Sequence, residues 1–188
     1  MNHQKNQLSL VFFGTPNFAT LSLVALLQAG YTPTIVTAPD KPVGRKQILT
    51  PSPVRQFAIA HNLPVFSPDK LDSDFYPTFE DIKPDLGVVV AYGKIIPDRF
   101  LQVAKHGFLN VHFSLLPKYR GPSPIQSAIL AGEKETGVSL MLLDQEIDHG
   151  PILAEVKYKI PDHAAYLEIE KQLAELGTKL LIETIPAY

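Results

Sequence analysis

The chain has 188 residues, 45% of them hydrophobic, a length and composition that suit one globular domain with a full core. Its 17 Lys and Arg residues stand against 19 Asp and Glu residues, so the net charge of −2 offers no basic surplus of the kind that nucleic-acid-binding domains usually carry. The absence of cysteine excludes disulfide bonds and cysteine-ligated metal sites and is typical of a reducing cytoplasm. Because no apolar run is long enough for a transmembrane helix or a signal peptide, we expect a cytoplasmic protein with no membrane partner.

The chain opens with the pattern of a strand, a tight turn and a helix. Residues 8–13 form an apolar run that ends at Gly14, which predicts a buried parallel strand. Thr15 is a suitable N-cap and Pro16 suits a first helical turn, so we expect a helix from there to Gly30. The turn lacks the G-x-G-x-x-G pattern of dinucleotide-binding proteins, which argues against NAD or FAD. Gly14 is then either part of a tight turn or a substrate contact.

Residues 38–50 differ from their surroundings because they are rich in Pro, Gly, Lys and Arg and show no periodicity. A strand at 34–37 is expected before them, and a helix that begins at Pro51 or Ser52 after them. A long loop inside a compact domain is uncommon and often functional, although a mobile surface loop is the alternative.

Strands at 63–66 and 86–90 and a helix at 72–80 are expected in the middle of the chain. Because ligands bind outside the carboxyl ends of strands in open α/β sheets, Tyr92 and Gly93 could form one wall of a ligand site. An ordinary strand-to-helix turn is the other interpretation of these two residues.

Asn110 and His112 carry the strongest chemical signal. They stand two residues apart in the run 108–113, so on a strand they point to the same face. Two such donors at a strand end can stabilise an oxygen that becomes negative during a reaction. Asp148 is a candidate acid partner further along the chain. Taken singly, each of these residue types is more often structural than catalytic.

The second half of the chain continues the alternation of strands and helices. We expect a helix at 123–130, strands at 137–143 and 151–160 that could pair antiparallel, and a long helix at 164–182. This order predicts a single α/β domain, Rossmann-like, with a mainly parallel central sheet flanked by helices. The His and Asp residues lack the close spacing of metal ligands, so no metal is expected.

Several short motifs together resemble one known family. Asn110-Val-His112, Ser114-Leu-Leu-Pro117, Arg120-Gly121, Asp148 and Gly150 are similar, in type and order, to the core motif of the 10-formyltetrahydrofolate-dependent formyltransferases. Segments 13–16, 39–45 and 50–54 resemble the branch of the family that acts on methionyl-tRNA. The resemblance covers residues 8–182 and departs from the usual family pattern at Phe113, at Glu146-Ile147 and at His149.

The resemblance implies a role for each group of candidate residues. Asn110 and His112 would stabilise a tetrahedral intermediate, and Asp148 would assist proton transfer. The residues that would bind the formyl donor, 10-formyltetrahydrofolate, are Tyr92, Gly93, Ser114, Leu115, Leu116, Pro117, Leu143, Asp144 and Ile147. The residues that would contact the acceptor substrate are Gly14, Thr15, Pro16 and Arg45, with Arg45 reaching the tRNA from the loop 38–50.

The reaction implied by this resemblance is formyl transfer to the α-amine of methionyl-tRNA in translation initiation. Relatives of this kind usually carry a C-terminal barrel domain that helps to hold tRNA, so we expect residues 1–188 to be a catalytic domain that binds tRNA weakly and is monomeric. Two alternatives stay open: a formyltransferase acting on a small amine such as an amino-sugar nucleotide, and a folate-binding auxiliary domain. Residues 39–54 favour tRNA, whereas the lack of a barrel domain in this sequence favours a small acceptor.

Overall fold

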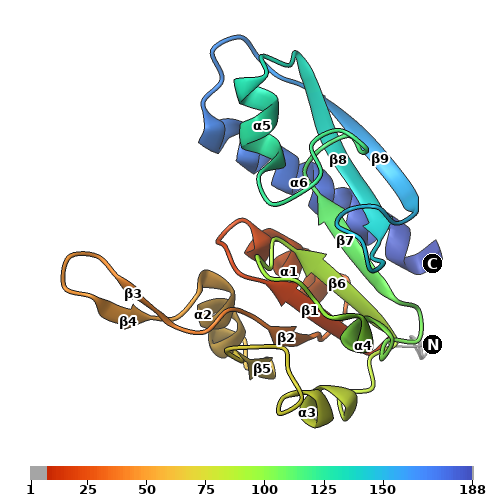
Figure 1. Cartoon of the computed structure of the whole chain (residues 1–188). Coiled ribbons are helices and arrows are strands. Elements are labelled where there is room, and N and C mark those ends of the chain that lie inside the picture. Colours follow the sequence, from red (N-terminus) through yellow and green to blue (C-terminus); the bar gives the residue numbers. More distant parts are fainter. Residues whose placement is uncertain (1–7, 188) are drawn as a thin grey trace.

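The computed structural model of the chain describes residues 8–187. Its main feature is a sheet of seven strands in the order β5-β2-β1-β6-β7-β8-β9, with helices on both faces (Figure 1). The strands of this sheet are β1 (Leu10–Gly14), β2 (Thr34–Val36), β5 (Val65–Phe66), β6 (Leu86–Val90), β7 (Phe108–His112), β8 (Glu135–Leu142) and β9 (Ile152–Lys159). The helices are α1 (Ala19–Gln28), α2 (Pro53–Ala60), α3 (Tyr76–Glu80), α4 (Asp98–Leu101), α5 (Pro124–Leu130) and α6 (Tyr166–Thr184), which a short 3₁₀ turn (Ile185–Ala187) follows.

The sheet confirms the prediction of a Rossmann-like α/β fold. Strands β5, β2, β1, β6 and β7 run parallel, and β8 and β9 continue the sheet in antiparallel fashion beyond β7. The chain runs outward from β1 through β2 to β5 and then starts again with β6 on the other side of β1. The strand order therefore reverses between β1 and β6, and ligands of open α/β sheets bind outside the carboxyl ends of the strands at such a point.

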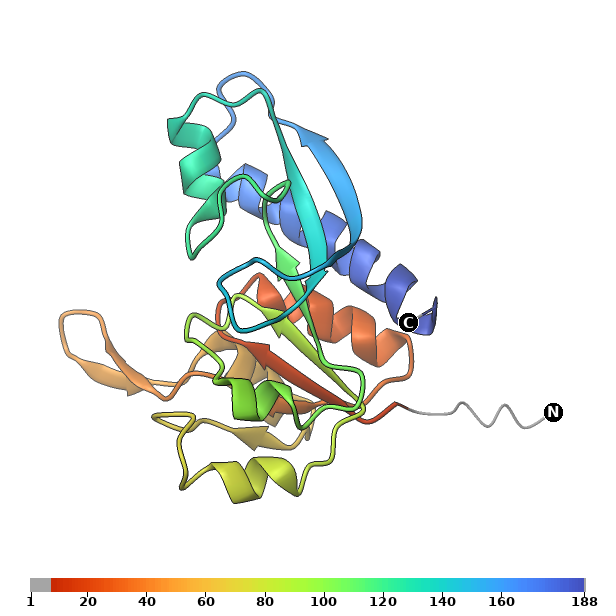
Figure 2. The same ribbon diagram turned by 45° about the vertical axis from the view of Figure 1, so that its right-hand side comes forward.

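Two apolar cores lie on opposite faces of the sheet because side chains alternate along each strand. On β7, Leu109 and Val111 belong to the core that includes α1 and α6, two helices that lie side by side (Figures 1 and 2). Phe108 belongs to the other core, together with residues of α3 and α4. By the period of two, Asn110 and His112 share the face of Phe108. His112 is the last residue of β7, at its carboxyl end, and Asn110 lies two residues before it.

Helix α1 begins later than the sequence suggested. Its first residue is Ala19, whose N–H donates to the Pro16 carbonyl at 3.1 Å, so residues 15–18 form a turn before the helix. Thr15 is not the helix cap, because its hydroxyl donates to the Tyr92 carbonyl at 2.8 Å. The predicted cap was wrong because the Thr15 hydroxyl bonds to the residues after another strand instead of to the N–H groups of its own helix. This bond ties the carboxyl ends of β1 and β6 together.

Segment 38–50 is not an irregular loop. Strands β3 (Lys41–Val43) and β4 (Ile48–Thr50) pair antiparallel, and the resulting hairpin projects from the body of the molecule (Figures 1 and 2). The strands were missed because exposed three-residue strands show no apolar alternation. Helix α2 begins at Pro53, close to the expected start, and Ser52 caps it because its Oγ accepts the Arg55 N–H at 3.0 Å. Helix α4 was also missed because four residues are too few to show a helical period.

Candidate active site

Asp148 lies next to Asn110 and His112, the two other residues that the sequence singled out as catalytic. Its Oδ1 accepts a hydrogen bond from Asn110 Nδ2 at 3.2 Å, and its Oδ2 lies 3.6 Å from His112 Nδ1. The second distance is longer than a hydrogen bond, and the contact is an ion pair only when His112 is protonated. Oδ2 also accepts the Gly121 N–H at 2.7 Å. The carboxylate of Asp148 therefore orients the Asn110 amide and faces the His112 ring.

His112 is 5% exposed, and each of its ring nitrogens faces a defined neighbour. Nε2 lies 3.0 Å from the backbone carbonyl oxygen of Tyr119. Because a carbonyl oxygen can only accept, Nε2 carries the hydrogen in this contact. Nδ1 is then the atom that faces Asp148. The two contacts together fix the orientation of the imidazole ring.

The loop between β8 and β9 is shaped so that it presents Asp148. The Asp144 carboxylate accepts the Glu146 N–H at 2.9 Å and lies 3.0 Å from His149 Nδ1. The hydrogen bond from His149 lowers the pKa of Asp144. Asp148 has a φ of +47°, a conformation that Asp tolerates better than most residues. Gly150 is required because a Cβ there would lie 2.0 Å from the Leu142 carbonyl oxygen.

The segment 114–117 turns back over the sheet directly after β7. The Ser114 hydroxyl is fully buried and donates to the Lys118 carbonyl at 2.6 Å, and the buried Leu116 donates its N–H to Ser139 Oγ at 3.0 Å. The Ser114 hydroxyl and the Leu116 backbone thus hold the turn itself. Leu115 is half-buried and Pro117 is exposed, so these two could face a ligand.

The carboxyl ends of β1 and β6 lie side by side, with Gly14 paired to Val90. The Tyr92 side chain is 2% exposed and packs edge-on against Phe13, so only its backbone can line a ligand site. Its hydroxyl has no hydrogen-bond partner among residues 8–187, and burial raises the pKa of Tyr92 to about 12. Gly93 has a φ of +80° and open space where a Cβ would stand.

Other predicted site residues are spread over several loops. Leu143 packs against the core that contains Phe108, whereas Ile147 is 64% exposed. Ile95, which the sequence did not single out, is 79% exposed in the segment after Gly93. Arg45 lies exposed in the turn of the β3–β4 hairpin and is not part of the cluster around Asp148 (Figure 1). Pro16 belongs to the turn before α1.

The sequence also missed the backbone groups that complete the cluster. The Tyr119 carbonyl and the Gly121 N–H contact His112 and Asp148, but every residue carries such groups, so no residue type could indicate them. The glycine of the pair Arg120-Gly121 was the one sequence feature that indicated a special backbone conformation here, because a glycine allows the φ of +100° found at this position.

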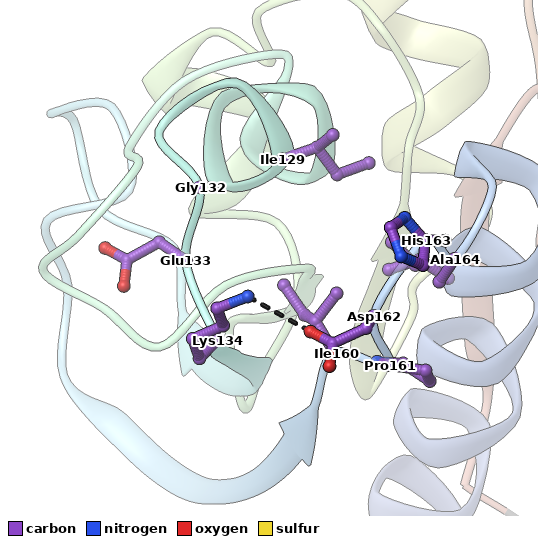
Figure 3. Close-up of a pocket in the computed structure, with 10 residues that line it drawn as sticks. Ile129, Gly132, Glu133, Lys134, Ile160, Pro161, Asp162, His163 and Ala164 are labelled. Atoms are coloured by element: carbon purple, nitrogen blue, oxygen red, sulfur yellow. Dashed lines mark hydrogen bonds and ion pairs between the residues drawn. The ribbon is translucent and has the colours of Figure 1, made fainter.

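A cavity of about 440 Å³ lies apart from these residues, where the end of α5 and residues 132–134 meet the segment 160–164 and the first turn of α6 (Figure 3). None of the three clustered side chains lines it. Within residues 8–187, no group of three or more His, Asp or Glu side chains could hold a metal ion. No helix in the same range is long and apolar enough to cross a membrane.

Comparison with known proteins gives a consistent set of relatives. Residues 8–185 match the formyl transferase family. The methionyl-tRNA formyltransferase of Caldicellulosiruptor saccharolyticus is 46% identical over 182 residues, which cover 95% of this chain and 58% of that protein. The methionyl-tRNA formyltransferase of Chloroflexus aggregans is 46% identical over 181 residues, covering 95% of this chain and 59% of that protein. The chain thus spans just under three fifths of the length of these curated relatives.

Solved structures share the fold at lower sequence identity. Phosphoribosylglycinamide formyltransferase of Bacillus halodurans superposes with a TM-score of 0.78 at 21% identity, covering 94% of this chain and 92% of that one. The N-formyltransferase of Helicobacter canadensis, solved with folinic acid and dTDP-3-aminofucose, has a TM-score of 0.73 at 22% identity. That match covers 96% of this chain and 63% of the other.

Proposed function

Because this chain belongs to the formyl transferase family, we propose that it transfers the formyl group of 10-formyltetrahydrofolate to the α-amine of methionyl-tRNA. Support for this acceptor comes from the curated relatives, which are 46% identical and are named for that reaction. The observation that carries the proposed chemistry is the cluster of Asn110, His112 and Asp148 at the carboxyl end of β7.

The reaction is an acyl transfer in which the protein stabilises one developing charge and assists the transfer of one proton. A C–N bond forms between the amine and the formyl carbon, the bond from that carbon to the donor nitrogen breaks, and a proton passes from the amine to that nitrogen. Negative charge develops on the formyl oxygen. Asn110 uses one N–H toward Asp148 and has a second with which to donate to this oxygen. His112 would supply another donor by turning one ring nitrogen from its present neighbour, the Tyr119 carbonyl at Nε2 or Asp148 at Nδ1, toward the substrate. Losing one such donor typically costs about a hundredfold in rate.

Asp148 serves the proton transfer in this proposal. Its two oxygens accept hydrogen bonds from Asn110 and from the Gly121 N–H, so the carboxylate is held in one orientation. Its 3.6 Å separation from His112 Nδ1 is wider than a direct hydrogen bond, and a water molecule held near both groups could relay the proton of the amine. The side chain is 11% exposed, which limits screening of its charge.

The formyl donor carries a flat heterocycle, and several features fit such a group. Gly93 leaves open space beside the backbone, and the apolar side chains of Ile95 and Ile147 are exposed rather than buried. A flat ring could pack against these groups and gain hydrogen bonds from the loop at 143–147. Leu115 and Pro117 would extend this surface on the side of His112, and Asp144 would shape it through its contact with His149.

The β3–β4 hairpin supports a nucleic-acid acceptor. Lys41, Arg45 and Lys46 are all exposed on it, so it presents positive charge despite the net charge of the chain. Its base is fixed, because Asp40 forms an ion pair with Arg55 of α2 and Thr37 Oγ1 lies 2.7 Å from Ser52 Oγ. A basic projection with a fixed base can reach a phosphate backbone at a constant position.

Single-turnover formyl transfer, with methionyl-tRNA and an amino-sugar nucleotide offered in parallel, tests the proposal. We expect formylated methionyl-tRNA from the natural protein and none from His112→Ala. His61→Ala, which changes an exposed histidine directly after α2, serves as the matched control. Transfer to the sugar alone would replace the proposed acceptor with a small amine. Donor binding without transfer to either acceptor would refute the proposed activity and favour an auxiliary folate-binding role.

A further inference from the structure

We propose that Glu133 is a positioning residue that sets the orientation of His112 and Asp148 through the segment 118–121. This inference rests on the proposed function, because it concerns the same site. Glu133 stands between α5 and β8. Its side chain binds Lys118 and Tyr119 rather than Asn110, His112 or Asp148. Its effect is transmitted through Lys118 and Tyr119.

One oxygen of Glu133 holds two consecutive residues of the segment. Glu133 Oε1 accepts the Tyr119 hydroxyl at 2.7 Å and the Lys118 ammonium at 2.9 Å. The hydrogen bonds from Tyr119 and Lys118 lower the pKa of Glu133, and those same hydrogen bonds raise the pKa of Tyr119 and of Lys118. All three directions favour an ionised Glu133 bound to both neighbours.

The same segment makes the two backbone contacts that orient the catalytic pair. The Tyr119 carbonyl lies 3.0 Å from His112 Nε2, and the Gly121 N–H donates to Asp148 Oδ2 at 2.7 Å. Tyr119 has a φ of +56°, which non-glycine residues adopt only where surrounding contacts hold them there. Tyr119 therefore links Glu133 to the site, because its side chain binds Glu133 and its carbonyl binds His112.

Glu133 is itself fixed to the body of the protein. Its N–H donates to the Ala128 carbonyl at 3.1 Å at the end of α5, so its backbone cannot follow the segment if the segment moves. Figure 3 shows the Glu133 side chain directed away from the neighbouring Lys134, which instead forms an ion pair with Asp162 at 3.1 Å. The carboxylate of Glu133 thus binds Lys118 and Tyr119 rather than a group in the cavity beside it.

Loss of the Glu133 carboxylate should lower the rate of the chemical step rather than weaken substrate binding. Without Glu133 the Tyr119 carbonyl can shift, and a displacement of about 1 Å at a reacting group can cost about a hundredfold in rate. Because the residues proposed to bind the donor and the acceptor do not include Glu133, KM for both substrates should be unchanged. A neutral amide keeps an oxygen acceptor at the same place, so Glu133→Gln should retain much of the activity.

The experiment compares Glu133→Ala, Glu133→Gln, Tyr119→Phe and the double variant Tyr119→Phe/Glu133→Ala. Glu135→Ala is the matched control, because it removes an exposed ion pair of similar length, 3.1 Å to Lys157, from the same stretch of chain. The readouts are kcat and KM for formyl transfer and the ring-nitrogen NMR shifts of His112, assigned with His112→Ala. We expect Glu133→Ala and Tyr119→Phe to lower kcat by about tenfold or more, the double variant to be no worse than either, and the His112 shifts to move in each.

Unchanged His112 shifts in Glu133→Ala would overturn the proposal, whatever happens to activity. A loss of kcat that Glu133→Gln does not restore, together with additive effects in the double variant, would overturn it as well, since that pattern indicates general destabilisation. The NMR readout does not depend on the acceptor. If the natural protein fails to formylate methionyl-tRNA, the proposed function fails, while a moved His112 signal still supports the positioning role.

Discussion

Replacing Asp148 with asparagine is the most direct test of the cluster at the end of β7. The substitution keeps the size and shape of the side chain but removes its charge and one of its two acceptor oxygens. In the structure both oxygens are used, one by Asn110 Nδ2 and the other by the Gly121 N–H. The new amide can accept on one side only, so its NH₂ group must face one of these two donors. The carboxylate charge that faces His112 Nδ1 at 3.6 Å is also removed.

The expected magnitude follows from these contacts. A hydrogen bond to a charged group contributes about 1.5–3 kcal/mol, and a buried donor left unpaired costs a similar amount. If about 3 kcal/mol of this is lost in the transition state, the rate falls by about two orders of magnitude, because about 1.4 kcal/mol corresponds to tenfold. The side chain is 11% exposed, so solvent compensates little. We therefore expect Asp148→Asn to reduce kcat about a hundredfold, with a smaller effect on KM.

The assay is single-turnover formyl transfer from 10-formyltetrahydrofolate, with circular dichroism to establish that the variant is folded. Asp162→Asn is the control, because it makes the same chemical change at an ion-paired carboxylate that is 79% exposed. A rate for Asp148→Asn equal to that of the control would refute the assignment of Asp148 to the reaction. A rate loss that a thermal melt explains by unfolding would refute it as well.

Three other variants test separate parts of the site. Gly150→Ala would place a Cβ 2.0 Å from the Leu142 carbonyl oxygen, so the loop that carries Asp148 must shift; transfer should fall about tenfold or more in the single-turnover assay, and an unchanged rate would contradict this. Tyr92→Phe removes a buried hydroxyl that has no partner within residues 8–187, so the free energy of unfolding in urea should rise by about 1 kcal/mol, and a fall would show that the hydroxyl is satisfied. Because burial raises the pKa of Tyr92 from 10.0 to about 12, the unfolded chain ionises first, and the natural protein should lose more stability than this variant as the pH rises through that window. Arg45→Ala at the hairpin tip should raise KM for methionyl-tRNA and make it less sensitive to salt, and an equal effect on a small amine acceptor would contradict a role in tRNA binding.

Features with a local physical cause could be predicted from the sequence. The alternation of strands and helices, and with it the Rossmann-like fold, follows from apolar periodicity and from turn residues that act over a few positions. Asn110 and His112 share a face for the same reason, because the side-chain period of a strand is two wherever the strand lies. The long helix expected at 164–182 is α6 at Tyr166–Thr184, since its apolar spacing extends over many turns.

Only the tertiary structure decided which distant groups meet. The contact of Asp148 with Asn110 spans 38 residues of sequence, and the loop that makes it is held by a glycine and a hydrogen bond between His149 and Asp144 rather than by any apolar pattern. Tyr92 looked accessible at a strand end but is buried, because burial depends on the packing of Phe13 and its neighbours from other strands. The backbone groups of Tyr119 and Gly121 carried no sequence signal at all. Sequence thus determined the periodic elements and the residue types of the site, whereas packing determined their distances, because distances between remote segments are a property of the whole fold.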